Sequence, residues 1–133
     1  MLLLDASVWV PPGISANPSH GSAAAFARGG VPVTALDLTL YEVINAVAGG
    51  YGQPGQAQKI ARAIVRTCGD DLVRVDGALG EEIAEVVSEH GISAYDAAYV
   101  AAARRNGWQL VSLDIRDLVS KGLAVTPDAS VYP

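Results

Sequence analysis

Four acidic residues lie at the ends of predicted strands or near the starts of predicted helices, where their carboxylates can come together. Asp5 directly follows the apolar run 2–4, and Asp114 directly follows the apolar run QLVSL. Glu42 in TLYEVIN and Asp96 in SAYDAAY each fall in the opening turns of an expected helix. In open parallel α/β sheets, ligands bind beyond the carboxyl ends of the strands, where helices can also begin. We therefore expect these four side chains to converge at that edge of the sheet.

A convergent set of carboxylates predicts a metal site. Like charges repel, and such a cluster is costly unless a cation neutralises it. Ligands that are all oxygen favour a hard ion, so the expected cofactor is Mg²⁺ or Mn²⁺. The two histidines, His20 and His90, are far apart in the sequence and lack the spacing of zinc ligands.

Each acid also has a purely structural interpretation. Glu42 and Asp96 both fit the last position of a capping box, and an acid near a helix N-terminus is stabilised by the helix dipole. The residues that would cap the two helices are Thr39 and Ser93. Asp114 fits a cap of the turn that follows it, and Asp5 fits an ordinary turn residue. The joint arrangement is more informative than any single member.

The elements expected to position the acids alternate between strands and helices. Short apolar runs predict strands at residues 2–4, 31–33, 72–75, 108–113 and 123–125. Helical spacing of apolar residues predicts helices at about residues 22–28, 37–48, 54–67, 78–89 and 93–106. The segment 11–21, rich in Pro, Gly and Ser, predicts a loop. This alternation is typical of an α/β domain with a parallel sheet.

Composition limits the classes of protein that the chain can belong to. A length of 133 residues predicts one domain, and half of the residues are apolar. Only 17% are charged, which suggests that a partner covers some apolar surface. One cysteine, Cys68, predicts a buried structural thiol in a reducing compartment. No targeting signal or membrane span is evident, so we expect a cytoplasmic protein. A net charge of −5 argues against nucleic-acid binding, because phosphate contacts require basic surface.

The sequence nevertheless resembles the PIN domains, and more narrowly the VapC ribonuclease toxins of type II toxin–antitoxin systems. The resemblance rests on LLLDASVWV, LTLYEVINAV and ISAYDAAYVAAARRNGWQLVSLDIRDL, with the acids in the family's order. It implies a three-layer α/β/α sandwich with a mainly parallel central sheet, formed by residues 1–133 as one PIN-like domain. It also implies that Asp5, Glu42, Asp96 and Asp114 hold Mg²⁺ or Mn²⁺ at the scissile phosphate of an RNA.

The resemblance extends to residues around the four acids. Ser7, Asn45 and Ser112 match positions that are commonly polar in the family, and Ser7 would help to order the metal site. Asp117 stands where some members carry a further acid, so it is a candidate additional ligand. Simple local hydrogen bonding is the alternative interpretation of the polar residues.

Bound cations would reduce the charge objection to an RNA substrate. Arg104 and Arg105 close the helix that carries Asp96, and Arg116 follows Asp114 closely, so these three are candidate RNA contacts. Lys59, Arg62 and Arg66 form one stripe of a predicted helix. The alternative interpretation is that these basic residues lie on a solvated helix face or interact favourably with the dipole at a helix C-terminus.

The same resemblance implies partners, and rival functions stay open beside it. A toxin of this kind is expected to form a homodimer and to bind an antitoxin, which would place an arginine against the carboxylates. The segment 11–20 departs from the family's pattern and leaves the partner surface open. The rivals are a PIN nuclease that processes RNA without an antitoxin, an inactive PIN module that binds RNA or protein, and a phosphatase with a nucleophilic aspartate. The phosphatase is disfavoured because Asp5-Ala6-Ser7 is not a DxD motif.

Overall fold

A short parallel sheet runs through the middle of the molecule. The computed structural model describes residues 1–11, 14 and 22–130. The strands are β1 (Leu2–Leu4), β2 (Val33–Thr34) and β3 (Gln109–Val111), in the order β2–β1–β3. β1 is central and parallel to both neighbours, with Leu2 opposite Val33 and Gln109. The predicted parallel sheet is confirmed.

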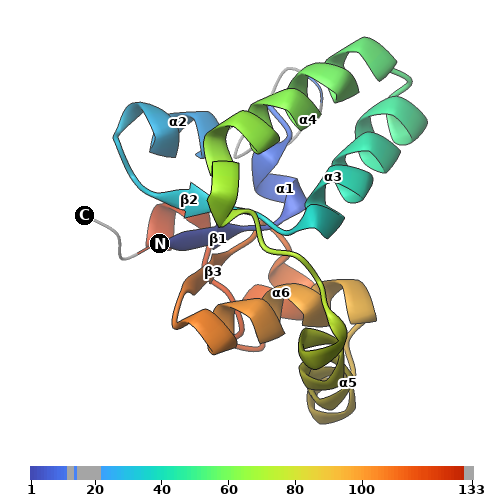
Figure 1. Ribbon diagram of the computed structural model, residues 1–133, viewed down its shortest axis with the longest axis vertical. Coiled ribbons are helices and arrows are strands. Elements are labelled where there is room, and N and C mark those ends of the chain that lie inside the picture. The colour runs from blue at the N-terminus through green and yellow to red at the C-terminus, as the bar shows by residue number, and fades with distance from the viewer. Residues whose placement is uncertain (12–13, 15–21, 131–133) are drawn as a thin grey trace.

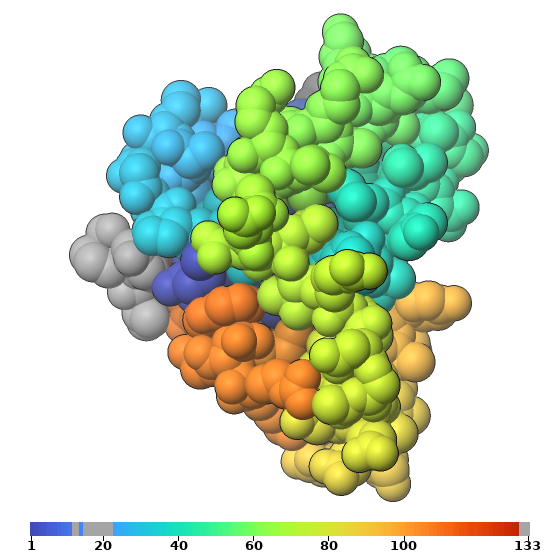
Figure 2. All heavy atoms as spheres, viewed as in Figure 1, coloured from blue at the N-terminus to red at the C-terminus, as the bar shows by residue number. Residues whose placement is uncertain are grey.

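Helices cover the two faces of this sheet (Figure 1). On one side lie α1 (Ala6–Trp9), α2 (Ser22–Arg28), α3 (Asp37–Ile44) and α4 (Pro54–Cys68). On the other lie α5 (Gly77–His90) and α6 (Ala94–Asn106). Figure 2 shows a face on which the chain after α4 crosses from the first helical layer to the second. The three-layer α/β/α sandwich that the resemblance implied is therefore confirmed.

The alternation of side chains along the strands divides the interior into two cores. Leu2 and Leu4 of β1 pack into one core, which also contains Cys68, whereas Leu3 packs into the other. β3 divides in the same way, with Val111 in the first core and Leu110 in the second. Successive side chains of a strand point to opposite faces, so three apolar residues in a row satisfy both layers.

Several segments differ from the sequence expectations. Residues 72–75 and 123–125 do not form strands: each pairs at one position only, Val73 with Leu36 and Val125 with Val111. Helix α1 was not expected, because the four residues after Asp5 carry too short a pattern to indicate a helix. The loop predicted for residues 11–21 lies almost entirely outside the described residues.

Four shorter helical segments complete the described chain. Two are π-helical, η1 (Asn45–Gly50) and η3 (Ile115–Val119), and two are 3₁₀, η2 (Gly69–Asp71) and η4 (Pro127–Ala129). The η1 segment continues α3 directly beyond Glu42. π-helical turns within helices are uncommon and often occur at functional sites. Within the described residues, no helix combines the length and apolar character needed to cross a lipid bilayer.

Candidate metal centre

Asp5 sits at the carboxyl end of the central strand, where two serines hold it. Its carboxylate caps α1 by accepting the Ser7 backbone N–H at 3.0 Å, and it also accepts the Ser7 hydroxyl. The Ser112 hydroxyl, just beyond β3, donates to the other carboxylate oxygen. Each serine oxygen in turn accepts a backbone N–H, from Leu113 at 3.1 Å and from Asp114 at 2.9 Å. The two serines therefore connect the ends of β1 and β3 through the Asp5 side chain.

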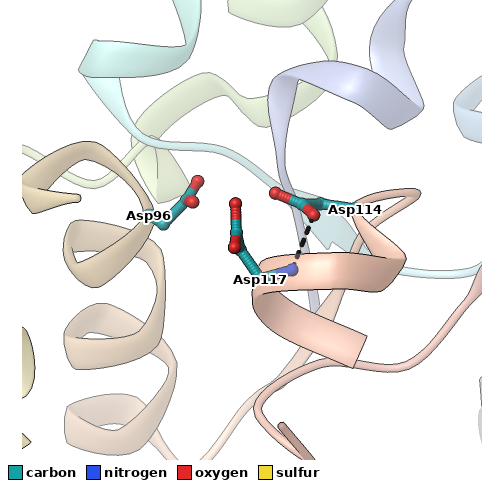
Figure 3. A group of neighbouring side chains, drawn as sticks. All are labelled: Asp96, Asp114 and Asp117. Carbon is teal, nitrogen blue, oxygen red and sulfur yellow. Dashed lines mark hydrogen bonds between the residues drawn. The ribbon is translucent and has the colours of Figure 1, made fainter. Parts of the chain in front are cut away.

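Three further acids meet beside the start of α6. Asp96 projects from the first turn of α6, and Asp114 and Asp117 lie at the beginning of η3 (Figure 3). Each offers a carboxylate oxygen, and these oxygens lie within 4.8 Å of one another. Asp114 caps η3 by accepting the Asp117 backbone N–H at 2.9 Å, which fixes the spacing of these two acids. The additional acid, Asp117, is thus part of the closest group among the described residues.

Glu42 is held by a hydrogen bond that reaches it from α6, on the other side of the sheet. Tyr99 on α6 donates its hydroxyl hydrogen to Glu42 Oε1 at 2.6 Å. The Thr39 hydroxyl lies 2.8 Å from the Tyr99 oxygen and accepts the Leu36 backbone N–H at 3.1 Å. Because Tyr99 donates to the carboxylate, the Thr39 hydrogen is directed to Tyr99 and every donor has an acceptor. We call Thr39, Tyr99 and Glu42 the tyrosine relay.

Of the two predicted helix caps, the structure corrects one and confirms the other. Thr39 is not the N-cap residue of α3, because the helix begins at Asp37 and Leu36 occupies the N-cap position. Thr39 is the third helical residue, and its hydroxyl accepts the backbone N–H of Leu36. Ser93 does cap α6, and its hydroxyl oxygen accepts the Asp96 backbone N–H at 3.1 Å.

The pKa values of the acids indicate one coupled cluster. Burial raises the pKa of Asp5 to about 6, against the effect of its serine hydrogen bonds and with a small contribution from repulsion by Glu42. Burial and repulsion by Asp114, Glu42 and Asp117 raise the pKa of Asp96 to about 6. Burial also raises the pKa of Glu42, although the hydrogen bond from Tyr99 opposes the rise. Glu42 therefore links Asp5 electrostatically to the group around Asp96.

The chemistry of this donor set fits a hard divalent cation. All candidate ligands are carboxylate oxygens, which suit Mg²⁺ or Mn²⁺. Two ligands on opposite sides of an octahedral Mg²⁺ stand about 4.2 Å apart, from bonds of about 2.1 Å. The oxygens of Asp96, Asp114 and Asp117 lie within 4.8 Å of one another, which is compatible with ligands of one cation. The raised pKa values also show that the ionised cluster is unfavourable without a counter-charge.

A hollow of about 580 Å³ opens beside Glu42. Glu42 and Asn45 line it, so the polar position predicted at Asn45 is adjacent to the site. Tyr41 and Tyr95 also line the hollow, and both are largely exposed. Each tyrosine directly precedes one of the predicted acids in the sequence.

The structure brings one of the three candidate arginines to the acids and places two elsewhere. Arg116 lies in η3, is 94% exposed and approaches Asp117 at 3.9 Å. Arg104 and Arg105 end α6, at the opposite end from Asp96, and contact acids of α5. These contacts are Arg104 with Glu89 at 3.3 Å and Arg105 with Glu82 at 3.3 Å. The arginine pair thus joins two helices instead of facing the cluster.

Sequence reasoning did not identify the tyrosine relay. One available signal was the position of Tyr99 three residues after Asp96, which places both on one face of the helix. The other was its size in an alanine-rich helix, because a buried tyrosine usually needs a hydrogen-bond partner for its hydroxyl. Neither signal identifies Glu42 as that partner.

Comparisons with known proteins identify the family and support the fold. The PIN domain family model matches residues 2–120, whereas no curated protein matched the sequence. A toxin–antitoxin complex from Klebsiella pneumoniae has a TM-score of 0.66 at 17% identity, over 96% of this chain and 98% of its own. FitAcB from Neisseria gonorrhoeae has a TM-score of 0.67 at 20% identity, over 98% of this chain and 100% of its own. VapC20 from Mycobacterium tuberculosis, described as a sarcin–ricin loop cleaving toxin, has a TM-score of 0.68 at 22% identity, over 92% of this chain and 95% of its own.

Proposed function

The chain belongs to the PIN domain family, and from that premise we propose that it is a divalent-metal-dependent endoribonuclease, the toxin of a type II toxin–antitoxin pair. The observation that carries the proposal is the meeting of Asp96, Asp114 and Asp117 oxygens within 4.8 Å. The charge of Glu42 acts on Asp96 in this group and also on Asp5.

In this proposal Asp5, Glu42, Asp96, Asp114 and Asp117 would hold Mg²⁺ or Mn²⁺ near the scissile phosphate. A bound cation of this kind neutralises phosphate charge and makes a water molecule more acidic. The protein's own groups fix the geometry: Ser7 and Ser112 orient Asp5, and the tyrosine relay orients Glu42. Water attacks phosphorus, the bond to the leaving oxygen breaks, and a carboxylate accepts the proton of the water. No residue becomes covalently attached.

An RNA cleavage assay tests the activity. Wild-type protein is incubated with a mixed RNA pool and Mg²⁺, Mn²⁺ or EDTA, beside Asp5→Asn and Asp96→Asn. Asp128→Asn, which changes an exposed acid outside the cluster, is the matched control. We expect metal-dependent cutting that both cluster variants lose and the control keeps. Cutting that survives EDTA or both cluster substitutions would sink the proposed mechanism.

An antitoxin is the proposed protein partner. The similarity to solved toxin–antitoxin proteins supports it, and an apolar groove of about 420 Å³ offers a surface. Trp9, Ala23, Ala27, Ile60 and Ala63 line the groove. The indole N–H of Trp9 is buried and finds no acceptor among the described residues. An antitoxin arginine at the acidic cluster would meet opposite charge.

Binding to the product of an adjacent gene tests this partner. We expect Ala27→Glu and Ala63→Glu to abolish complex formation and leave RNA cleavage unchanged, because both residues lie away from the acids. Wild-type protein that cuts RNA but ignores that product would favour a processing nuclease without an antitoxin.

A homodimer is the second proposed assembly. Leu40, Ile44, Ala61 and Val65 line an apolar depression on α3 and α4. Ile44 is 43% exposed and Val65 is 49% exposed. Contiguous exposed apolar surface of this kind marks interaction sites. Light scattering should give twice the chain mass for wild type and the single-chain mass for Val65→Asp.

A further inference from the structure

Two exposed tyrosines, one from each helical layer, line the hollow that Glu42 also lines. Tyr41 on α3 is 74% exposed and directly precedes Glu42; Tyr95 on α6 is 62% exposed and directly precedes Asp96. Both line the same hollow, together with Glu42 and Asn45. Aromatic rings usually contribute large buried areas, so two rings left open to solvent at one hollow favour a flat, partly apolar ligand.

The negative net charge of the protein limits how many basic side chains can bind the phosphates of an RNA strand near the acids. Its net charge is −5, and phosphate contacts need basic side chains. Arg104 and Arg105 contact acids at the far end of α6. Stacking on a base needs no positive charge, because every base has a π-face. The two rings can therefore supply affinity that the few basic side chains near the cluster do not.

We propose that Tyr41 and Tyr95 stack on bases of an unpaired RNA segment whose scissile phosphate lies at the acids. The amide of Asn45, in the same hollow, has both donors and an acceptor for a base edge. In a duplex the bases cover one another's faces, whereas bases in loops and ends can be splayed out onto aromatic rings. The inference rests on the proposed function and adds to it the side chains that would bind the bases beside the scissile phosphate.

Steady-state kinetics on one RNA in two forms tests the inference. The probe is an oligonucleotide that the wild-type protein cuts in the pool assay, used single-stranded and annealed to its complement. Wild type should cut the duplex at least about tenfold less efficiently. Tyr41→Ala and Tyr95→Ala should each raise KM for the single strand by about 5- to 150-fold, the usual range for one lost stacking contact, with a smaller effect on kcat.

Matched variants separate ring stacking from a hydroxyl effect. Tyr41→Phe and Tyr95→Phe keep the π-face and should keep KM within about threefold of wild type. Tyr51→Ala removes a third exposed ring, 48% exposed, which is not part of the hollow, and should behave as wild type. A 2-aminopurine base placed beside the cleaved bond should show fluorescence quenching that both alanine variants lose.

Each outcome decides the inference. If wild type cuts no RNA, the proposed function fails and this inference fails with it. If wild type cuts and both alanine variants keep the wild-type KM, only the stacking role is overturned. If the alanine variants lose affinity together with the dimer mass, and Val65→Asp reproduces that loss, the tyrosines act as contacts between copies and the inference is also overturned.

Discussion

Removing the Tyr99 hydroxyl tests whether the tyrosine relay positions Glu42. Tyr99→Phe deletes a 2.6 Å hydrogen bond to a carboxylate and leaves the fully buried Thr39 hydroxyl without its acceptor. A hydrogen bond to a charged group contributes about 1.5–3 kcal/mol, and a buried polar group left unpaired costs about 1–3 kcal/mol. Because the two effects share one oxygen atom, we expect the free energy of unfolding to fall by about 2–3 kcal/mol.

The variant should also bind metal more weakly. Removing a group that orients a ligand typically costs 10- to 100-fold in metal affinity. The Tyr99 hydrogen bond lowers the pKa of Glu42, so its loss raises that pKa and protonation competes with metal up to a higher pH. Urea unfolding and Mn²⁺ titration at several pH values measure both effects. Tyr51→Phe, at an exposed tyrosine, is the control. A folded Tyr99→Phe protein with wild-type stability and Mn²⁺ affinity would refute the positioning role.

Three further predictions follow from the charges and hydrogen bonds of the site. Metal-free protein should lose stability as pH rises from about 4 to above 6, because folding raises the pKa of Asp5 and Asp96 and the unfolded chain binds fewer protons in that pH range. Thermal unfolding in EDTA at several pH values measures this loss. Asp96→Asn should flatten the dependence of stability on pH. Ser112→Ala should lower the free energy of unfolding by about 1–3 kcal/mol in urea, because a buried Asp5 oxygen loses its donor. Substituting Arg104 and Arg105 together by Gln should change KM for RNA less than twofold and stability by roughly 0–1 kcal/mol per ion pair, and a large rise in KM would restore their predicted RNA contact.

The sequence was informative wherever local pattern and topology agree. Asp5 and Asp114 could be placed at one edge because each ends an apolar run, and parallel strands bring their carboxyl ends together. The alanine-rich helix carrying Asp96 has an N-cap, Ser93, that the sequence identifies directly. These features depend on neighbours within a few residues, which a single sequence displays.

The features that the sequence did not predict depend on contacts between segments that are distant in the sequence. Thr39 fitted a helix cap by its spacing from Glu42, but its hydroxyl is used by Tyr99, which is 60 residues away. The predicted strand at 72–75 has suitable residues yet pairs only at Val73, because Arg74 and Val75 are exposed and no strand continues beside them. Such outcomes are decided by tertiary neighbours, which override local propensity.

The order of the strands has a consequence for when the acidic site comes into being during synthesis. The central strand β1 is made first, but one of its neighbours, β3, comes from residues 109–111. Asp5 is tied to Ser112 across 107 positions of sequence, and Asp114 and Asp117 follow still later. A growing chain therefore carries Asp5 and Glu42 without the other acids until residue 96 has been added. The site is assembled only after residues 96–117 have been added, so a nascent chain that ends before them has no complete carboxylate cluster.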